Sequence, residues 1–258
     1  MPGFSVSTRI MAAAIEFRDV SLKTTEGRAL LDHVNLSLEE GTTTAVLGRS
    51  GSGKTTLLRL VNRMLDPSDG TVFIRGKECE QLNVISLRRG IGYVIQETGL
   101  FPHFTVARNV GLVPELNGKH IDEKKIGELL TQVGLDFEKF AKRYPHQLSG
   151  GQRQRVGLAR ALAAGPSILL MDEPFGALDP LTRAEMQDML RDLLKRLKKT
   201  VLIVTHDLDE ALYLASRIVL LEDGHVITDV AAENFLQSEI HAVKAYAEAF
   251  HRGQEQRR

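Results

Sequence analysis

One glycine-rich segment, residues 48–55, limits what this chain can fold into more than any other feature. Its sequence, GRSGSGKT, satisfies the pattern G-x-x-x-x-G-K-[ST]. The apolar run 43–47 comes directly before it, and the helix-like stretch 55–64 follows it. In a strand, loop and helix of this order, the backbone N–H groups of the loop and the helix N-terminus converge on a phosphate group. The segment therefore predicts a phosphate-binding loop after a β-strand.

Lys54 and Thr55 give this loop the chemistry that nucleotide phosphates require. The Lys54 ammonium is expected to neutralise the β and γ phosphates, and the Thr55 hydroxyl is expected to ligate Mg²⁺. The alternative is a glycine-rich turn that merely joins a strand to a helix. A chance match in a chain of this length is on the order of one in a hundred, and the position between a strand and a helix favours the phosphate site.

Two carboxylates, Asp172 and Glu173, follow a second apolar run at 168–171. Ligands of open parallel sheets bind at the carboxyl ends of the strands, so Asp172 is expected to face the phosphate loop and to hold Mg²⁺. Glu173 is expected to orient or deprotonate the attacking water. The alternative is a solvated acidic pair that ends a strand.

A third apolar run, 201–204, leads to His206. Because this run is also expected to be a parallel strand, His206 should lie at the same edge of the sheet and contact the γ-phosphate. Asp207 and Glu210 have the spacing of a helix start. The alternative for a single histidine is a structural or surface role.

Other apolar runs alternate with helical patterns, which favours an α/β fold with a mainly parallel sheet. The strand-like runs are 15–20, 34–38, 71–74, 91–95 and 218–221. We expect one domain over residues 11–258, with a nucleotide-binding core of about 11–97 and 166–238, an inserted helical subdomain of about 98–165 and a short C-terminal helix of about 239–251. In the helical part, Asp122 is expected to cap a helix that stops at Gly134.

Composition excludes several classes of protein. Lysine plus arginine equals aspartate plus glutamate at 33 each, so the chain lacks the basic excess of a nucleic-acid binder, and no nucleic-acid partner is expected. The apolar runs fall far short of the ~18 residues that a transmembrane helix needs. The single cysteine, Cys79, excludes an intramolecular disulfide and a multi-cysteine metal site, which fits a reducing compartment.

A second anion-binding helix start follows the phosphate loop in the sequence. Its residues are Leu148, Ser149, Gly150, Gly151 and Gln152. A serine and two glycines that open a helix can bind a phosphate, but this segment has no lysine of its own. The segment resembles the signature motif of ABC-transporter ATPases. This resemblance implies a P-loop NTPase cassette with a mainly parallel core, an N-terminal antiparallel β subdomain and an inserted helical subdomain.

The resemblance also implies ATP hydrolysis by two cassettes, which close head to tail so that each signature motif meets the ATP of its partner; one chain type suffices for a homodimer. ATP and Mg²⁺ are the implied ligands. The resemblance implies that Gln96 links the site to the helical subdomain and ligates Mg²⁺. It further implies that Gln96 takes part in catalysis with Glu173 and His206. Asp179 is implied to lie in a loop at the dimer interface. The implied ATP-binding residues are Gly48, Arg49, Ser50, Gly51, Ser52, Gly53, Lys54, Thr55 and Thr56.

Residues 21–25 depart from the family pattern, because they include no aromatic residue to stack on adenine.

Segments 91–96, 99–106 and 113–116 resemble importers of quaternary-ammonium osmoprotectants such as glycine betaine, choline or carnitine. The alternatives are an importer of another small solute, such as methionine or a polyamine, or an ABC ATPase that is not an importer. The implied partners are transmembrane permease subunits and an extracytoplasmic substrate-binding protein, which place the chain on the cytoplasmic face of the membrane as a peripheral subunit.

Overall fold

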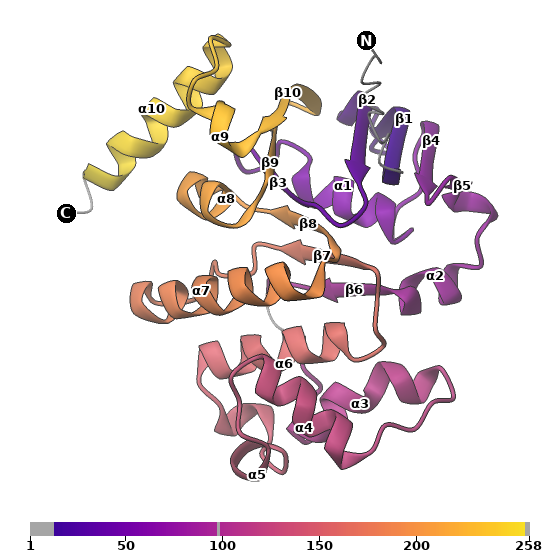
Figure 1. Ribbon diagram of the computed structural model, residues 1–258. Helices are drawn as coiled ribbons and strands as arrows, with labels where there is room; N and C mark the ends of the chain where they lie inside the picture. Colours follow the sequence, from indigo (N-terminus) through magenta and orange to yellow (C-terminus); the bar gives the residue numbers. More distant parts are fainter. Residues whose placement is uncertain (1–12, 97–98, 256–258) are drawn as a thin grey trace, which may run out of the picture.

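The computed structural model describes residues 13–96 and 99–255, and its largest element is a six-stranded sheet (Figure 1). The strand order is β10-β9-β3-β8-β7-β6. The strands are β3 (Thr43–Leu47), β6 (Ile91–Val94), β7 (Ile168–Asp172), β8 (Thr200–Val204), β9 (Arg217–Glu222) and β10 (His225–Ala231). Every neighbouring pair from β9 to β6 is parallel, and only β10 runs antiparallel. The carboxyl ends of β9, β3, β8 and β7 therefore meet at one edge.

A second, four-stranded sheet is antiparallel throughout, as expected for the N-terminal subdomain. Its order is β2-β1-β4-β5. The strands are β1 (Ala13–Lys23), β2 (Ala29–Glu39), β4 (Asp69–Ile74) and β5 (Lys77–Glu78). One apolar cluster joins both sheets through α1 (Lys54–Val61), which buries Leu57, Leu58 and Leu60. This packing fixes the helix that starts at the phosphate loop.

Helix α1 ends at Val61, and the prediction that it continues to residue 64 was wrong. Arg63 adopts a left-handed conformation with φ 52°, which ends the helical run. Its guanidinium donates hydrogen bonds to the carbonyls of Glu80 and Leu82 at 3.1 and 3.0 Å. A contact with residues far along the chain therefore outweighs the local helical preference.

A group of helices between β6 and β7 lies below the sheet in Figure 1. They are α3 (Val106–Leu116), α4 (Glu123–Gln132), α5 (Phe137–Phe140), the 3₁₀ turn Pro145–Gln147 and α6 (Gly150–Leu162). The predicted start of α4 is confirmed, because the Asp122 carboxylate accepts a hydrogen bond from the Lys125 N–H at 2.8 Å. Gly134 follows with φ 72°, which ends the segment as predicted.

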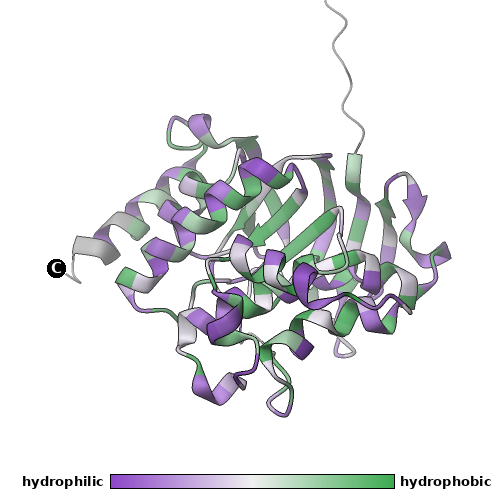
Figure 2. Ribbon diagram, turned by 60° about the horizontal axis from the view of Figure 1, so that its bottom comes forward, coloured by the Kyte–Doolittle hydropathy of each residue, from purple (hydrophilic) through white to green (hydrophobic). Residues whose placement is uncertain are grey.

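The remaining helices are α2 (Val84–Gly90), α7 (Pro180–Leu197), α8 (Leu208–Leu214), α9 (Ala232–Phe235) and α10 (His241–Glu255), with a 3₁₀ turn at Cys79–Gln81. Apolar residues gather on the central strands, whereas polar residues lie on the outer faces of the helices (Figure 2). Helix α10 packs on α8, α9 and the strands β3 and β9 through an apolar cluster that includes Val243 and Phe235. Within the described ranges, no helix is long and apolar enough to span a bilayer.

Candidate active site

The phosphate loop, residues 48–53, joins β3 to α1 in a conformation that only glycine tolerates at two positions. Gly53 has φ 104°, and a Cβ there would lie 2.6 Å from the Leu30 carbonyl oxygen. Gly51 has φ 83° and open space where a side chain would stand. The buried Ser52 hydroxyl oxygen has no hydrogen-bond partner among the described residues. A loop with an open face and an unpartnered buried hydroxyl fits an anionic ligand.

Lys54, the first residue of α1, points back into this loop. Its Nζ atom donates hydrogen bonds to the carbonyl oxygens of Gly48 and Arg49, both at 2.8 Å. The side chain is buried, and this desolvation lowers its pKa, while the negative charges of Glu173 and Asp172 oppose the change. A buried ammonium beside two carboxylates provides the positive charge that a phosphate chain requires.

Thr55 and Asp172 meet across the cleft between α1 and β7. The Thr55 hydroxyl donates a hydrogen bond to Oδ1 of Asp172 at 2.9 Å, and the Tyr93 hydroxyl donates one to Oδ2 at 3.5 Å. Burial raises the pKa of the Asp172 carboxyl, although the Thr55 hydrogen bond opposes this rise. A hydroxyl and a carboxylate at this distance are a donor set that Mg²⁺ prefers.

Glu173 lies between Gln96 and His206. The Gln96 Nε2 atom donates to Oε2 of Glu173 at 3.3 Å, and Nδ1 of His206 lies 3.3 Å from Oε1. Glu173 also has φ 44°, a left-handed conformation that costs a non-glycine residue free energy. Its own N–H donates to the Val204 carbonyl at 2.9 Å, which ties this conformation to the neighbouring strand. The fold thus brings together three residues that are far apart in the sequence.

The signature segment lies at the start of α6. Ser149 is the N-cap: its hydroxyl accepts a hydrogen bond from the Gln152 N–H at 3.2 Å, and the Gln152 side chain accepts one from the Ser149 N–H at 3.0 Å. Gly150 lines a cavity with Gln96 and Leu178, whereas the phosphate loop lines a different cavity. Within the described residues, the phosphate loop and the start of α6 therefore line two different cavities.

Asp179 caps the start of α7, directly after this cavity. Its carboxylate accepts a hydrogen bond from the Thr182 N–H at 3.1 Å. This hydrogen bond lowers the pKa of Asp179. The carboxylate is therefore held in place as an anion.

Comparison with known proteins agrees with this geometry. The family model described as "ABC transporter" matches residues 31–176, which include the phosphate loop, the signature segment and Glu173. The chain belongs to the ABC transporter family. Its solved relatives include the ATP-binding cassette MJ0796, whose structure is a dimeric post-hydrolysis state bound to ADP and Pi. The two chains are 36% identical, and the match has a TM-score of 0.76 and covers 84% of this chain and 98% of MJ0796. Another is cbiO1 of Clostridium perfringens, part of the cbiONQ transporter, with 26% identity and a TM-score of 0.78 over 96% and 100%.

Curated ABC relatives are similar over most of this cassette. The osmoprotectant import ATP-binding protein OsmV of Salmonella typhimurium is 46% identical over 80% of this chain and 54% of its own length. The glycine betaine uptake system ATP-binding protein YehX of Escherichia coli is 47% identical over 83% and 69%. The choline transport ATP-binding protein OpuBA of Bacillus subtilis is 46% identical over 82% and 56%. The chain thus spans about half the length of two of these three relatives.

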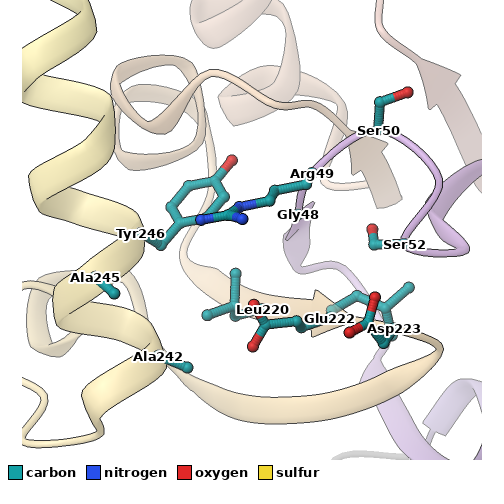
Figure 3. Close-up of a pocket in the computed structure, with 11 residues that line it drawn as sticks. Gly48, Arg49, Ser50, Ser52, Leu220, Glu222, Asp223, Ala242, Ala245 and Tyr246 are labelled. Carbon is teal, nitrogen blue, oxygen red and sulfur yellow. The ribbon is translucent and has the colours of Figure 1, made fainter.

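Residues 21–25, which include no aromatic residue, form the end of β1 and the turn after it. In this turn the Thr24 carbonyl accepts a hydrogen bond from the Gly27 N–H at 2.9 Å. An aromatic residue beside the phosphate loop comes from the other end of the chain. Tyr246 of α10 lines a cavity of about 160 Å³ with Gly48 and Arg49 (Figure 3).

Sequence analysis missed two further residues near this ABC site. Tyr93 was assigned only to a strand, and its contact with Asp172 follows from the pairing of β6 with β7. Glu210 was recognised only as a helix-start residue, and its N–H does donate to the Asp207 carboxylate at 3.1 Å. Glu210 lines one cavity with His206 and Glu173, and burial raises the pKa of its carboxyl to about 8. No local sequence signal marks the Tyr93–Asp172 contact or the proximity of Glu210 to Glu173, because both depend on which strands are neighbours.

Proposed function

We propose that this chain binds and hydrolyses ATP as the motor subunit of an ABC importer for a quaternary-ammonium osmoprotectant. The Glu173 carboxylate, held between Gln96 and His206, carries the hydrolytic part of the proposal, because it can accept a proton from a water that attacks a phosphate bound at the neighbouring loop. Thr55 and Asp172 lie at the same edge of the sheet. The residues of the phosphate loop thus bind the nucleotide, and those of the strand ends act on it.

Each side chain has a task that follows from its contacts. Thr55, Asp172 and Gln96 would hold Mg²⁺, which supplies positive charge to the phosphate oxygens when bound. The Lys54 ammonium binds the β and γ phosphates once it exchanges its carbonyl partners for phosphate oxygens. Glu173 accepts a proton from the attacking water, and His206 orients Glu173 and contacts the γ-phosphate.

A second copy of the chain completes the site. The signature segment and the phosphate loop line different cavities, so each signature segment is free to bind the ATP held by the partner. A two-fold dimer then contains two composite sites, and the Asp179 loop crosses between them. The dimeric state of MJ0796 supports this arrangement.

The substrate class rests on the curated relatives, which act in uptake of osmoprotectants, glycine betaine and choline. By this proposal, the chain works on the cytoplasmic face of the membrane with permease subunits and an extracytoplasmic substrate-binding protein. We further propose that the nucleotide-binding core covers about 11–97 and 166–238 and that the helical subdomain, about 98–165, faces the permease. The C-terminal helix, expected at about 239–251, is α10 (His241–Glu255).

Reconstituted transport tests both parts of the proposal. The cassette, its permease and its binding protein are placed in liposomes with internal ATP, and uptake of radiolabelled glycine betaine and choline is compared with uptake of methionine and spermidine. We expect uptake of a quaternary amine, and Glu173→Gln should abolish it while ATP binding remains. ATP-driven uptake of methionine or spermidine alone would overturn the substrate class, whereas near-wild-type hydrolysis by Glu173→Gln would overturn the role of Glu173.

A further inference from the structure

Helix α10 reaches over the edge of the sheet where the nucleotide site lies. Tyr246 shares a cavity with Gly48 and Arg49, which follow β3, and with Glu222 and Asp223, at the end of β9. Figure 3 shows the Tyr246 ring pointing from α10 towards Arg49. A helix far along the chain thus places an aromatic side chain in a cavity that the phosphate loop also lines.

The Tyr246 hydroxyl also reaches the residues that follow β8. It donates a hydrogen bond to the backbone carbonyl of His206 at 2.9 Å, although the two residues are 40 positions apart. Burial raises the pKa of Tyr246 to about 12, while the backbone of Gly48 and the Arg49 charge oppose this rise. The hydroxyl therefore keeps its proton near neutral pH and remains a donor.

The His206 side chain has few constraints of its own. It is 62% exposed, and its Nδ1 atom lies 3.3 Å from Oε1 of Glu173. The direction of an exposed imidazole depends strongly on how its backbone is held. On the other side of His206, the Asp207 N–H donates to the Thr205 hydroxyl at 3.0 Å. The Tyr246 hydrogen bond anchors the His206 peptide group itself.

We propose that Tyr246 is a positioning residue for His206, so that α10 is a working part of the hydrolytic site. This inference rests on the proposed ATPase function. Tyr246 touches neither the nucleotide nor the attacking water in this scheme; it acts by holding the His206 carbonyl. Val243 of α10 packs in an apolar cluster with Phe235 of α9, and this packing holds α10, and with it the Tyr246 side chain, against the rest of the molecule.

Steady-state kinetics of full-length Tyr246→Phe, which removes only the hydroxyl, test this role. We expect kcat for ATP to fall about tenfold and KM for ATP to change less than about twofold. Tyr213→Phe is the matched control, because the Tyr213 hydroxyl donates to Asp188 on the surface of α7 and α8, and it should retain wild-type kcat. An unchanged kcat in Tyr246→Phe, or an equal loss in both variants, would overturn the proposal.

A double mutant separates positioning from general damage. If Tyr246 acts through His206, His206→Ala and His206→Ala/Tyr246→Phe should have the same kcat, whereas multiplied losses would count against the proposal. Hydrogen–deuterium exchange of residues 205–211 gives a readout that needs no turnover. Exchange there should be faster in Tyr246→Phe than in the wild type and in Tyr213→Phe. A wild type without ATPase activity would refute the proposed function, and the exchange result would still decide whether Tyr246 holds the His206 loop.

Discussion

Thr55 and Asp172 are 117 positions apart in the sequence, yet the Thr55 hydroxyl donates a hydrogen bond to Oδ1 of Asp172 at 2.9 Å. One residue belongs to the helix after the phosphate loop, and the other ends the strand β7. Their contact joins the two halves of the nucleotide-binding core that the helical segment separates.

Asp172→Asn should weaken Mg²⁺ binding and so raise the Mg²⁺ concentration that hydrolysis requires. The amide retains one oxygen but loses the negative charge, so the Mg²⁺ concentration for half-maximal ATPase activity should rise by about tenfold or more. Titration of activity with Mg²⁺ at saturating ATP measures this shift. Asp66→Asn removes an exposed carboxylate that pairs with Arg63 and serves as the control, with an unchanged midpoint. An unshifted midpoint in Asp172→Asn would argue against Asp172 as a ligand.

Lys54→Ala should weaken nucleotide binding. The buried ammonium is held 2.8 Å from two loop carbonyls and beside the expected phosphates, so its loss should raise the Kd for ATP by about 10- to 100-fold. Equilibrium binding of a fluorescent ATP analogue measures this change. Lys125→Ala, on the exposed surface of α4, should bind like the wild type. Equal affinity of Lys54→Ala and wild type would contradict the proposed role of the loop.

Two inactive variants should restore activity when mixed. Ser149→Arg blocks the signature segment and Lys54→Ala blocks the phosphate loop, so each homodimer should be inactive. A mixed dimer keeps one intact composite site, and random mixing should recover about a quarter of wild-type ATPase activity. The assay compares each variant alone with an equal mixture. If the mixture stays inactive although mixed dimers form, the composite site is wrong.

Glu210→Gln should make stability less dependent on pH. Burial raises the pKa of Glu210 to about 8 from 4.5, and the Asp207 charge adds to the rise, so the folded state favours the protonated carboxyl. The unfolded chain therefore loses this proton at a lower pH. The associated stability is complete below about pH 4.5, declines as the pH rises and is lost once the pH passes about 8; its full size is on the order of a few kcal/mol.

Thermal unfolding from pH 5 to 9 measures this effect. The Tm of Glu210→Gln should fall less than that of the wild type over this range, since the amide keeps an acceptor for the Thr205 hydroxyl and does not ionise. Glu80→Gln, an exposed position, should follow the wild type. Parallel Tm curves for Glu210→Gln and wild type would show that Glu210 does not titrate in this way.

The sequence alone determined the features that depend on short segments. The phosphate loop follows from glycine spacing, the start of α4 from Asp122, and the signature helix from a serine cap, because turns and caps are set by residues a few positions apart. The common sheet edge of Asp172 and His206 was also foreseeable, since each follows an apolar run of a parallel sheet.

Only the tertiary structure decided contacts between segments that are distant in the chain. It ended α1 at Val61, because Arg63 bonds to carbonyls near Leu82. It also formed β10 (His225–Ala231), which sequence analysis did not assign to a strand, through antiparallel pairing with β9. The Tyr246 hydrogen bond to His206 is of the same kind. Such contacts depend on which strands and helices become neighbours, and the free energy of that choice comes from the packed core as a whole rather than from any local pattern.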